Sequence, residues 1–388
     1  MRSFSEVLDL RLKKLDETFQ RRSLKSRSGI DFSSNDYLGF SQDPVLQERV
    51  LRRLRGQPVG ASGARLLRGH SELFETVEQN LARFSGQETA LILPSGYQAN
   101  LALLSGVLTA EDWVFSDQFN HASLIDGIRL SRARRVIYPH RDGVALRRAL
   151  EESHKQPGLK LIITESLFGM DGSKAPLAEL VDLAEEYSAL LMVDEAHATG
   201  LWGDGALGGG IVQSMGLSKR VFATTHTGGK ALGTGGAWIA GSAELKDYLV
   251  NFSRPFIFST APVPSLVISL DEALQFWSEV GNDRAKALFS KADQMQARLV
   301  DLEIPCRDPS PIVPIILGEN QMALQVAERI QNCGFDVRAI RPPTVPEGTA
   351  RLRISIHWDH SIEVIEALSN QVLAAVREVC TTREEKKT

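Results

Sequence analysis

The 388-residue chain is poor in cysteine: it has only Cys306, Cys333 and Cys380. No two of them form a CxxC pair, so the spacing indicates no disulfide framework, and we expect no metal site. A sparse, odd set of cysteines suits a reducing compartment, and we therefore expect a cytoplasmic protein. Long apolar runs are also missing. None approaches the ~20 residues that cross a bilayer, so no membrane span is expected.

Glycine and proline are not enriched, at 31 and 16 residues, which excludes collagen-like and Pro/Gly-rich disordered proteins. Neither sign of charge dominates, because the chain has 44 Lys and Arg and 48 Asp and Glu residues, which gives a net charge of −4. That balance argues against a dedicated nucleic-acid binder. The chain does contain 43% hydrophobic residues, which is typical of a globular protein. Its length suits about two to three domains.

The N-terminal segment has no signal-peptide core, and it carries acidic residues such as Glu6 and Asp9, which transit peptides avoid. Its apolar residues Val7, Leu8 and Leu12 recur at helical spacing. We therefore predict an amphipathic helical arm that packs on the body of the protein.

The middle of the chain alternates strand-like runs with amphipathic helices. Within residues 159–197 the runs LKLIITES and ALLMVDEAH flank the helical segment PLAELVDLAEEYS. Two nearly continuous apolar strands around a helix predict a βαβ crossover in a buried, mostly parallel sheet. A second strand-to-helix junction is ALILPSGYQANLALLSGVL.

After about residue 260 the pattern changes. A long helical stretch reaches Leu302, and strands near 312–317, 337–340 and 352–356 then alternate with helices near 320–332 and up to about Val379. This is an α+β pattern. We predict an α/β protein with a helical arm (1–45), a large α/β domain (46–280) and a small C-terminal α+β domain (281–388).

Two charged residues stand out in the large domain. Asp194 lies at the carboxyl end of a predicted parallel strand, where open α/β folds bind ligands. A carboxylate there needs a cationic partner, which can be a ligand or a protein Arg or Lys. Lys230 lies among glycines in TGGKALG, either as a closely approached functional lysine or in an ordinary surface loop.

Two further features could serve a ligand: a helix start that could bind an anion, and a histidine that could cover a ring. Gly96 and Tyr97 open a helix directly after a strand, which offers free N–H groups to an anion, although an ordinary turn has the same pattern. His121 is a lone histidine, for which a structural role is the simplest single interpretation. Together, an anion cradle, a carboxylate for a pyridinium, a lysine for a Schiff base and an aromatic cover are the parts of a pyridoxal phosphate site.

Two other classes of protein share parts of this pattern. Residues 194–197 spell the DEAH box of some nucleic-acid motors, but the chain has no GxxxxGK[ST] loop to bind the phosphates, so this class is disfavoured. A non-catalytic module with the same fold would be expected to lose Lys230 or Asp194, and both are present.

The chain resembles the α-oxoamine synthase family of fold-type I pyridoxal phosphate enzymes over nearly its whole length beyond about residue 30. The resemblance rests on the segments FSSNDYLG (32–39), GASGARLLRG (60–69), NHASL (120–124), MDG (170–172), VDEAHATG (193–200), TGGKALG (227–233) and AIRPPTVPEGTARLRIS (339–355). It implies a fold-type I architecture, a pyridoxal 5'-phosphate cofactor and a homodimer with shared sites.

The resemblance also implies roles for single residues. Lys230 would bond to the cofactor aldehyde, Asp194 would pair with the pyridine nitrogen, His197 with the phenolic oxygen, and His121 would stack on the ring. The cofactor phosphate would be held by Gly96, Tyr97 and Thr227, and by Ser259 and Thr260 of the neighbouring subunit.

On the substrate side, the resemblance implies that Arg353 and Asn35 bind the amino acid. The segment with RPPTVP favours the family member that joins L-alanine to a pimeloyl thioester in biotin biosynthesis, with coenzyme A or acyl carrier protein as the carrier. A sibling that uses glycine or serine stays open. One departure is Gly169, where the family commonly has a serine. A group of arginines, Arg129, Arg132, Arg134, Arg135 and Arg141, is either a solvated basic face or an attraction for the acidic carrier.

Overall fold

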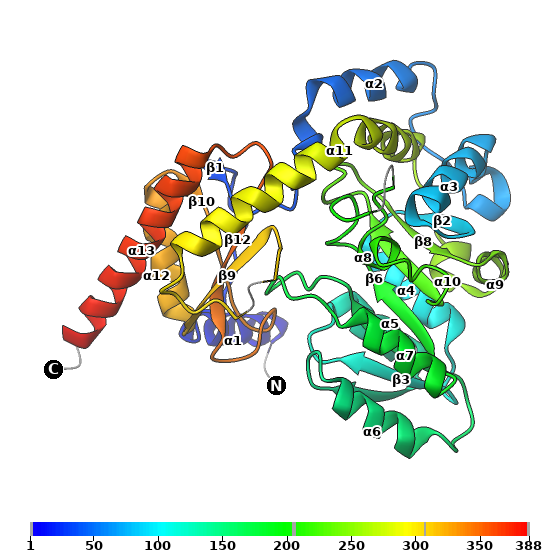
Figure 1. The fold of residues 1–388 in the computed structure, drawn as a ribbon, viewed down its shortest axis with the longest axis horizontal. Helices are drawn as coiled ribbons and strands as arrows, with labels where there is room; N and C mark the ends of the chain where they lie inside the picture. Colours follow the sequence, from blue (N-terminus) through cyan, green and yellow to red (C-terminus); the bar gives the residue numbers. More distant parts are fainter. Residues whose placement is uncertain (1–2, 204–206, 306–307, 386–388) are drawn as a thin grey trace. The chain divides into compact units, whose positions relative to one another are not determined.

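The computed structural model describes residues 3–203, 207–305 and 308–385 (Figure 1). Cys306 lies outside these residues. The chain divides into two compact units. The large unit comprises Leu38–Phe168 and Lys174–Lys286, and the small unit comprises Met1–Tyr37, Gly169–Ser173 and Ala287–Thr388. The division into an arm, a large and a small domain stays a prediction.

The large unit is built on a seven-stranded sheet with the order β2-β8-β7-β6-β5-β3-β4. Its strands are β2 (Thr89–Leu93), β3 (Trp113–Asp117), β4 (Arg134–Tyr138), β5 (Lys160–Glu165), β6 (Leu190–Asp194), β7 (Ala223–Thr227) and β8 (Ala237–Gly241). All neighbouring pairs are parallel except those of β8, which runs antiparallel to β2 and β7. The predicted mostly parallel sheet is therefore confirmed, and so is the crossover from β5 through α7 (Leu177–Glu186) to β6.

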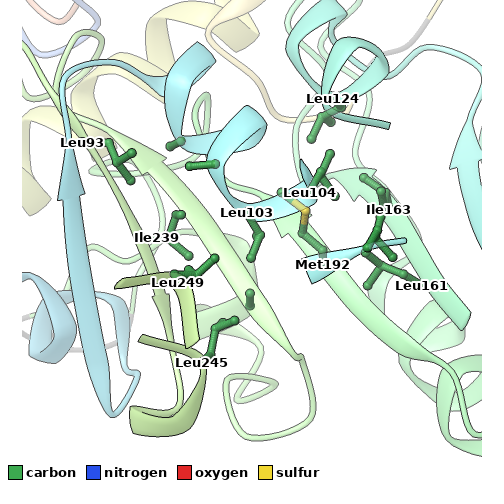
Figure 2. Packing of buried hydrophobic residues seen from close by; sticks show 14 of the residues in the cluster. Leu93, Leu103, Leu104, Leu124, Leu161, Ile163, Met192, Ile239, Leu245 and Leu249 are labelled. Carbon is green, nitrogen blue, oxygen red and sulfur yellow. The ribbon is translucent and has the colours of Figure 1, made fainter. Parts of the chain in front are cut away.

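Besides α7, the large unit contains the helices α2 (Pro44–Leu54), α3 (Glu72–Ser85), α4 (Gly96–Val107), α5 (Ala122–Ser131), α6 (Gly143–Ser153), α8 (Ile211–Ser214), α9 (Ala243–Phe252) and α10 (Arg254–Ile257), with short turns η1 (Phe40–Gln42) and η2 (Arg65–Gly69). The predicted long helix is α11 (Pro264–Arg298), which supplies residues to both units. Figure 2 shows Leu103 and Leu104 of α4 among the buried side chains of β5, β6 and β8. This burial fixes the start of α4 at one edge of the sheet.

The small unit has two small sheets and the helices α12 (Asn320–Asn332) and α13 (Ile362–Glu385). Strands β9 (Ile312–Gly318), β11 (Arg338–Ile340) and β12 (Ala350–Ser355) form an antiparallel sheet in the order β11-β12-β9. A second, parallel pair joins β1 (Ile30–Asp31) to β10 (Phe335–Asp336). The predicted α+β pattern is confirmed, although the last helix is longer than expected.

The predicted N-terminal helix forms as α1 (Phe4–Glu17), and Ser3 and Glu6 close its first turn as a capping box. None of its residues is buried, so the predicted packing of its apolar face is wrong for the single chain. None of the helices in the described ranges combines the length and apolar character that crossing a membrane requires.

Candidate functional site

Polar side chains gather at the carboxyl ends of neighbouring strands in the large unit. Asp194 ends β6, Thr227 ends β7 and Glu165 ends β5. The register pairs Glu165 with Asp194, and Asp194 with Thr225. Because parallel strands end at the same edge of a sheet, these groups lie at one edge, which is where open α/β folds bind ligands.

Asp194 is buried, and neutral donors hold both of its oxygens. Its Oδ2 accepts a hydrogen bond from the Asn100 amide nitrogen at 2.7 Å, and its Oδ1 accepts one from the Ala196 N–H at 2.9 Å. Asn100 of α4 and the backbone N–H of Ala196, just after β6, thus fix the orientation of this carboxylate. A carboxylate held in this way is suited to a cationic ring nitrogen of a ligand.

Lys230 is half-buried in a tight loop between β7 and β8. The loop is closed by hydrogen bonds from Gly228 N–H to Gly236 O at 3.0 Å and from Thr234 N–H to Gly228 O at 2.8 Å. A Cβ at Gly228 would lie 2.4 Å from the Thr234 hydroxyl oxygen, so only glycine fits there. This favours the functional interpretation over an ordinary surface loop.

The charge of Lys230 reaches two other groups of this edge. It helps to lower the pKa of His121, which is lowered mainly because the surroundings desolvate the charged ring. Glu165 is buried, and burial together with the negative charge of Asp194 raises its pKa well above the usual value, while Lys230 opposes this rise. The lysine, the histidine and the two carboxyl groups therefore form one electrostatic cluster.

The helix start for which we predict an anion-binding role also lies at this edge. Ser95 caps α4 by accepting the Gln98 N–H at 3.3 Å, and Gly96 and Tyr97 are the first residues of the helix. A Cβ at Gly96 would lie 3.6 Å from the Thr227 Cβ, so the helix start and the end of β7 are in close contact. The N–H groups of a first helical turn have no partner within the helix, and they suit a phosphate.

The other predicted residues of the large unit lie as follows. His197 is buried in the turns after β6. The Ser259 hydroxyl accepts a hydrogen bond from the Gln98 side chain at 3.3 Å, which ties this segment to the first turn of α4 in the same chain. The Ala261 N–H donates to Gly63 O at 2.9 Å, which joins the segment after Thr260 to the GASGARLLRG motif.

Asn35 and Arg353 come together in the small unit. Arg353 is buried on β12, and its Nη2 donates to the Asn35 side-chain oxygen at 2.8 Å and to the Tyr37 hydroxyl at 3.0 Å. Its Nε donates to Gly169 O at 2.5 Å. The backbone carbonyl of Gly169 makes this contact, so it does not depend on the serine that the family commonly has here.

Several residues of the cluster were missed by sequence reasoning. Asn100 and Ser123 connect Asp194 to His121 by hydrogen bonds. The Thr225 hydroxyl donates to the Asn100 oxygen, and Glu165 ends β5 beside Asp194. Asn100 and Ser123 lie within or next to motifs that were recognised, SGYQAN and NHASL, and that position was the available signal. Nothing local in the sequence shows that their side chains meet.

One trio of possible metal ligands occurs among the described residues: atoms of His357, Asp359 and His360 lie within 4.8 Å of one another. Both ring nitrogens of His360 have partners, because Nδ1 accepts the His357 N–H at 3.1 Å and Nε2 pairs with Asp31 O at 2.8 Å. The trio therefore resembles a hydrogen-bonded histidine cluster more than a metal site. The expectation of no metal stays a prediction.

A lysine in a rigid glycine loop, a fixed buried carboxylate, a histidine and a helix start beside a threonine lie at one sheet edge. This donor set fits pyridoxal phosphate, which needs an amine, a partner for its ring nitrogen and N–H groups for its phosphate. A family model described as aminotransferase class I and II matches residues 27–371. The chain belongs to this family.

The relatives narrow the class further. The chain is 39% identical to the 8-amino-7-oxononanoate synthase of Lysinibacillus sphaericus over 88% of this chain and 87% of that one. It is 40% identical to the synthase of the same name from Methylococcus capsulatus over 89% of each chain.

Solved structures agree with this class. A serine palmitoyltransferase variant from S. paucimobilis, solved with a bound PLP–myriocin aldimine, superposes with a TM-score of 0.89 at 26% identity, over 98% of this chain and 100% of that one. An 8-amino-7-oxononanoate synthase from Francisella tularensis superposes with a TM-score of 0.76 at 27% identity, over 90% of this chain and 98% of that one.

Proposed function

We propose that this chain is an 8-amino-7-oxononanoate synthase. The enzyme uses pyridoxal 5'-phosphate to join L-alanine to a pimeloyl thioester, with release of the thiol and of CO₂. The observation that carries the proposal is the likeness to synthases of this name, at 39–40% identity over most of both chains. The residues at the sheet edge support it, because they supply each group that the cofactor needs.

Within this proposal, the large unit holds the cofactor. Asp194 would accept the ring N–H, His197 would bind the phenolic oxygen and His121 would cover the ring. Lys230 would bond to the aldehyde carbon. The N–H groups of Gly96 and Tyr97, with Thr227, Ser259 and Thr260, would hold the phosphate. The cofactor, when bound, would supply an electron sink for the carbon that loses a proton.

The chain's own groups then act on the amino acid. The Lys230 amine would remove the Cα proton of alanine and later return a proton to the product. Asp194 would hold the proton on the ring nitrogen, because Asn100 and Ala196 keep its two oxygens in place. Arg353 and Asn35, which hydrogen-bond each other, bind the alanine carboxylate.

The proposal includes a cytoplasmic homodimer. Leu67 and Phe258 are 84% and 71% exposed in the single chain, and large apolar side chains with such exposure suit a subunit interface. They lie near the two segments joined by the Ala261–Gly63 hydrogen bond, next to Ser259 and Thr260. Cys333 and Cys380 are free, exposed thiols, as a reducing compartment permits.

The acyl donor is a pimeloyl group on coenzyme A or on an acyl carrier protein, and both carriers are acidic. Arg134 and Arg135 are exposed on strand β4 at the end of the sheet order, while Arg129 forms an ion pair with Asp126 at 3.0 Å. Reversing the charges of Arg134 and Arg135 should raise the KM for the acyl donor if this face attracts the carrier. An unchanged KM with both donors would assign these arginines to the solvated surface.

A sibling activity that uses serine or glycine is the second candidate. It is favoured by the TM-score of 0.89 to serine palmitoyltransferase, against 0.76 to the Francisella synthase. The sequence identities favour the first candidate, since the synthases reach 39–40% and the palmitoyltransferase only 26%.

The visible absorption spectrum of the purified protein separates these candidates. We expect a yellow protein whose cofactor band changes on titration with L-alanine but not with glycine or L-serine. Mass spectrometry should then detect 8-amino-7-oxononanoate when a pimeloyl thioester is added. A selective response to glycine or serine would instead assign the sibling activity. A protein that stays colourless with added pyridoxal phosphate would contradict both.

A further inference from the structure

Asn100 is a buried amide that connects the cofactor-facing groups, and its orientation is fixed. Its nitrogen donates to Asp194 Oδ2 at 2.7 Å and to the Ser123 hydroxyl at 2.9 Å. Its oxygen accepts the Thr225 hydroxyl at 2.8 Å. Because a carboxylate can only accept, the amide must turn its NH₂ group toward Asp194. In this orientation both N–H donors of the Asn100 amide and its oxygen have hydrogen-bond partners.

The chain of hydrogen bonds continues from Asn100 to His121. The Ser123 hydroxyl oxygen accepts from Asn100, so its single hydrogen is free for the His121 Nδ1 at 2.8 Å. The backbone N–H of Ser123 also donates to the same nitrogen at 3.3 Å. A ring nitrogen that receives two donors must present its lone pair, which leaves the proton of neutral His121 on Nε2.

We propose that Asn100 is a positioning residue that sets two groups of the site at once: the direction of the Asp194 carboxylate and, through Ser123, the Nε2-protonated tautomer of His121. The inference rests on the proposed function and deepens it. Nε2 of neutral His121 is then an N–H donor, and it does not serve as a base.

The side-chain chemistry at position 100 explains why an amide is suitable. Aspartate has no donor for Asp194 and would place a second carboxyl group beside it. Alanine would leave the buried Asp194 oxygen and the Thr225 hydroxyl without this partner. An amide alone donates to both Asp194 and Ser123 while it accepts from Thr225.

Two variants test separately the effect of Asn100 on Asp194 and its effect on His121. Asn100→Ala should raise the dissociation constant for pyridoxal phosphate at least about tenfold, since Asp194 loses a hydrogen bond to a charged group. Ser123→Ala keeps the bond between Asn100 and Asp194, and should change this constant less than about threefold. Both variants should change the tautomer equilibrium of His121. The ¹⁵N NMR spectrum of histidine-labelled holoenzyme reports it, with His121→Gln to assign the signals.

Ser253→Ala is the matched control. The Ser253 hydroxyl is buried like that of Ser123 and donates to Ala102 O of α4 at 3.0 Å, but it has no bond to Asn100 or His121. It should lower stability without changing the His121 signals. If Asn100→Ala does not fold, Ser123→Ala still tests whether this hydrogen-bond chain sets the tautomer of His121.

The proposal is overturned if wild-type His121 carries its proton on Nδ1, or if its tautomer is unchanged in Ser123→Ala. It is also overturned if Asn100→Ala binds the cofactor as the wild type does. A different result would contradict the proposed function: the absorption band of the cofactor in the wild-type protein would not respond to L-alanine, whatever the His121 spectrum shows.

Discussion

Lys230 is the residue on which the proposed chemistry depends most directly. Lys230→Ala removes the amine that bonds to the cofactor and carries the proton, so turnover of L-alanine with a pimeloyl thioester should fall by roughly 10³-fold or more. The visible band of the bound cofactor should shift as well. Steady-state assays and absorption spectra measure both effects. The exposed lysine Lys219 provides a control, because Lys219→Ala should keep wild-type turnover. Near-normal turnover in Lys230→Ala would refute its assigned role.

His226 makes the stability of the protein depend on pH. The ring is buried and stacked on Trp238 at 4.9 Å, and its nitrogens pair with the hydroxyls of Thr199 and Thr224 at 2.9 and 2.8 Å. Burial lowers its pKa from 6.5 to about 3. The folded state therefore keeps His226 neutral, whereas the unfolded chain takes up a proton below pH 6.5. Stability from this residue is present above that pH and is lost as the pH falls toward 3.

Between pH 7 and pH 5, this linkage should lower the free energy of unfolding by about 2 kcal/mol. His226→Gln keeps a hydrogen-bonding side chain and does not titrate, so it should lose about 2 kcal/mol less than the wild type over the same interval. Urea unfolding at the two pH values measures the difference. Equal losses in the two proteins would show that His226 is not responsible.

At the scale of residues, the sequence identified the groups whose chemistry is unusual for their setting. Asp194 ends strand β6 as predicted, and Lys230 lies in the loop between β7 and β8. Asn100 and Ser123 could not be assigned in the same way, because their roles depend on contacts with side chains far away in the chain. Asn100 meets Asp194 across 94 positions, and no local pattern encodes such a pair.

At the scale of elements, Glu78 of α3 holds four parts of the large unit together. Its carboxylate pairs with Arg65 of η2, accepts the Ile92 N–H of β2 at 2.9 Å and pairs with Lys246 of α9 at 2.8 Å. Glu78→Ala leaves the buried Arg65 without its counter-charge, and it should lower the free energy of unfolding by about 3–5 kcal/mol.

A surface ion pair provides the comparison. Glu279 pairs with Arg49 at 2.6 Å, but its side chain is 49% exposed, so Glu279→Ala should cost only about 0–1 kcal/mol. Urea unfolding of both variants measures the contrast. Similar losses in the two variants would mean that burial of the Glu78 pair contributes little.

Helices and strands whose apolar pattern continues over several residues could be predicted from the sequence, and very short strands could not. The helix α12 and the strands β5, β6 and β9 follow from patterns that continue over several residues. Strands β1 and β10 have two residues each, which is too short for any alternation to be read. They exist because backbone groups of segments about 300 positions apart pair with each other.

At the scale of the whole molecule, the small unit is assembled from segments that lie far apart in the sequence. It gathers the first 37 residues and the short segment Gly169–Ser173 with the C-terminal part of the chain. Arg353 is one reason, because its guanidinium bonds Asn35, Tyr37 and Gly169. A buried arginine with several donors must find acceptors wherever the chain provides them, and sequence position does not limit that choice.

The proposed homodimer with shared sites gives a prediction for the assembled protein. Sedimentation should show twice the mass of one chain. If Ser259 and Thr260 serve the neighbouring subunit's site, a Lys230→Ala chain and a Ser259→Ala/Thr260→Ala chain should complement each other. Each mixed dimer then contains one site with an intact lysine and an intact phosphate contact. When equal amounts of the two variant chains pair at random, half of the dimers are mixed, and each of these has one of its two sites intact. The mixture should therefore show about a quarter of wild-type activity at limiting cofactor, which exceeds the mean activity of the two parent variants.

The alternative arrangement has a distinct outcome. The Gln98–Ser259 hydrogen bond already links Ser259 to the helix start of its own chain. If Ser259 and Thr260 act only within that chain, each mixed dimer contains one site without its lysine and one site without its hydroxyls. Its activity would then equal the mean of the parents. Co-expression with two affinity tags isolates the mixed dimer, so its activity alone decides which subunit supplies the phosphate contact.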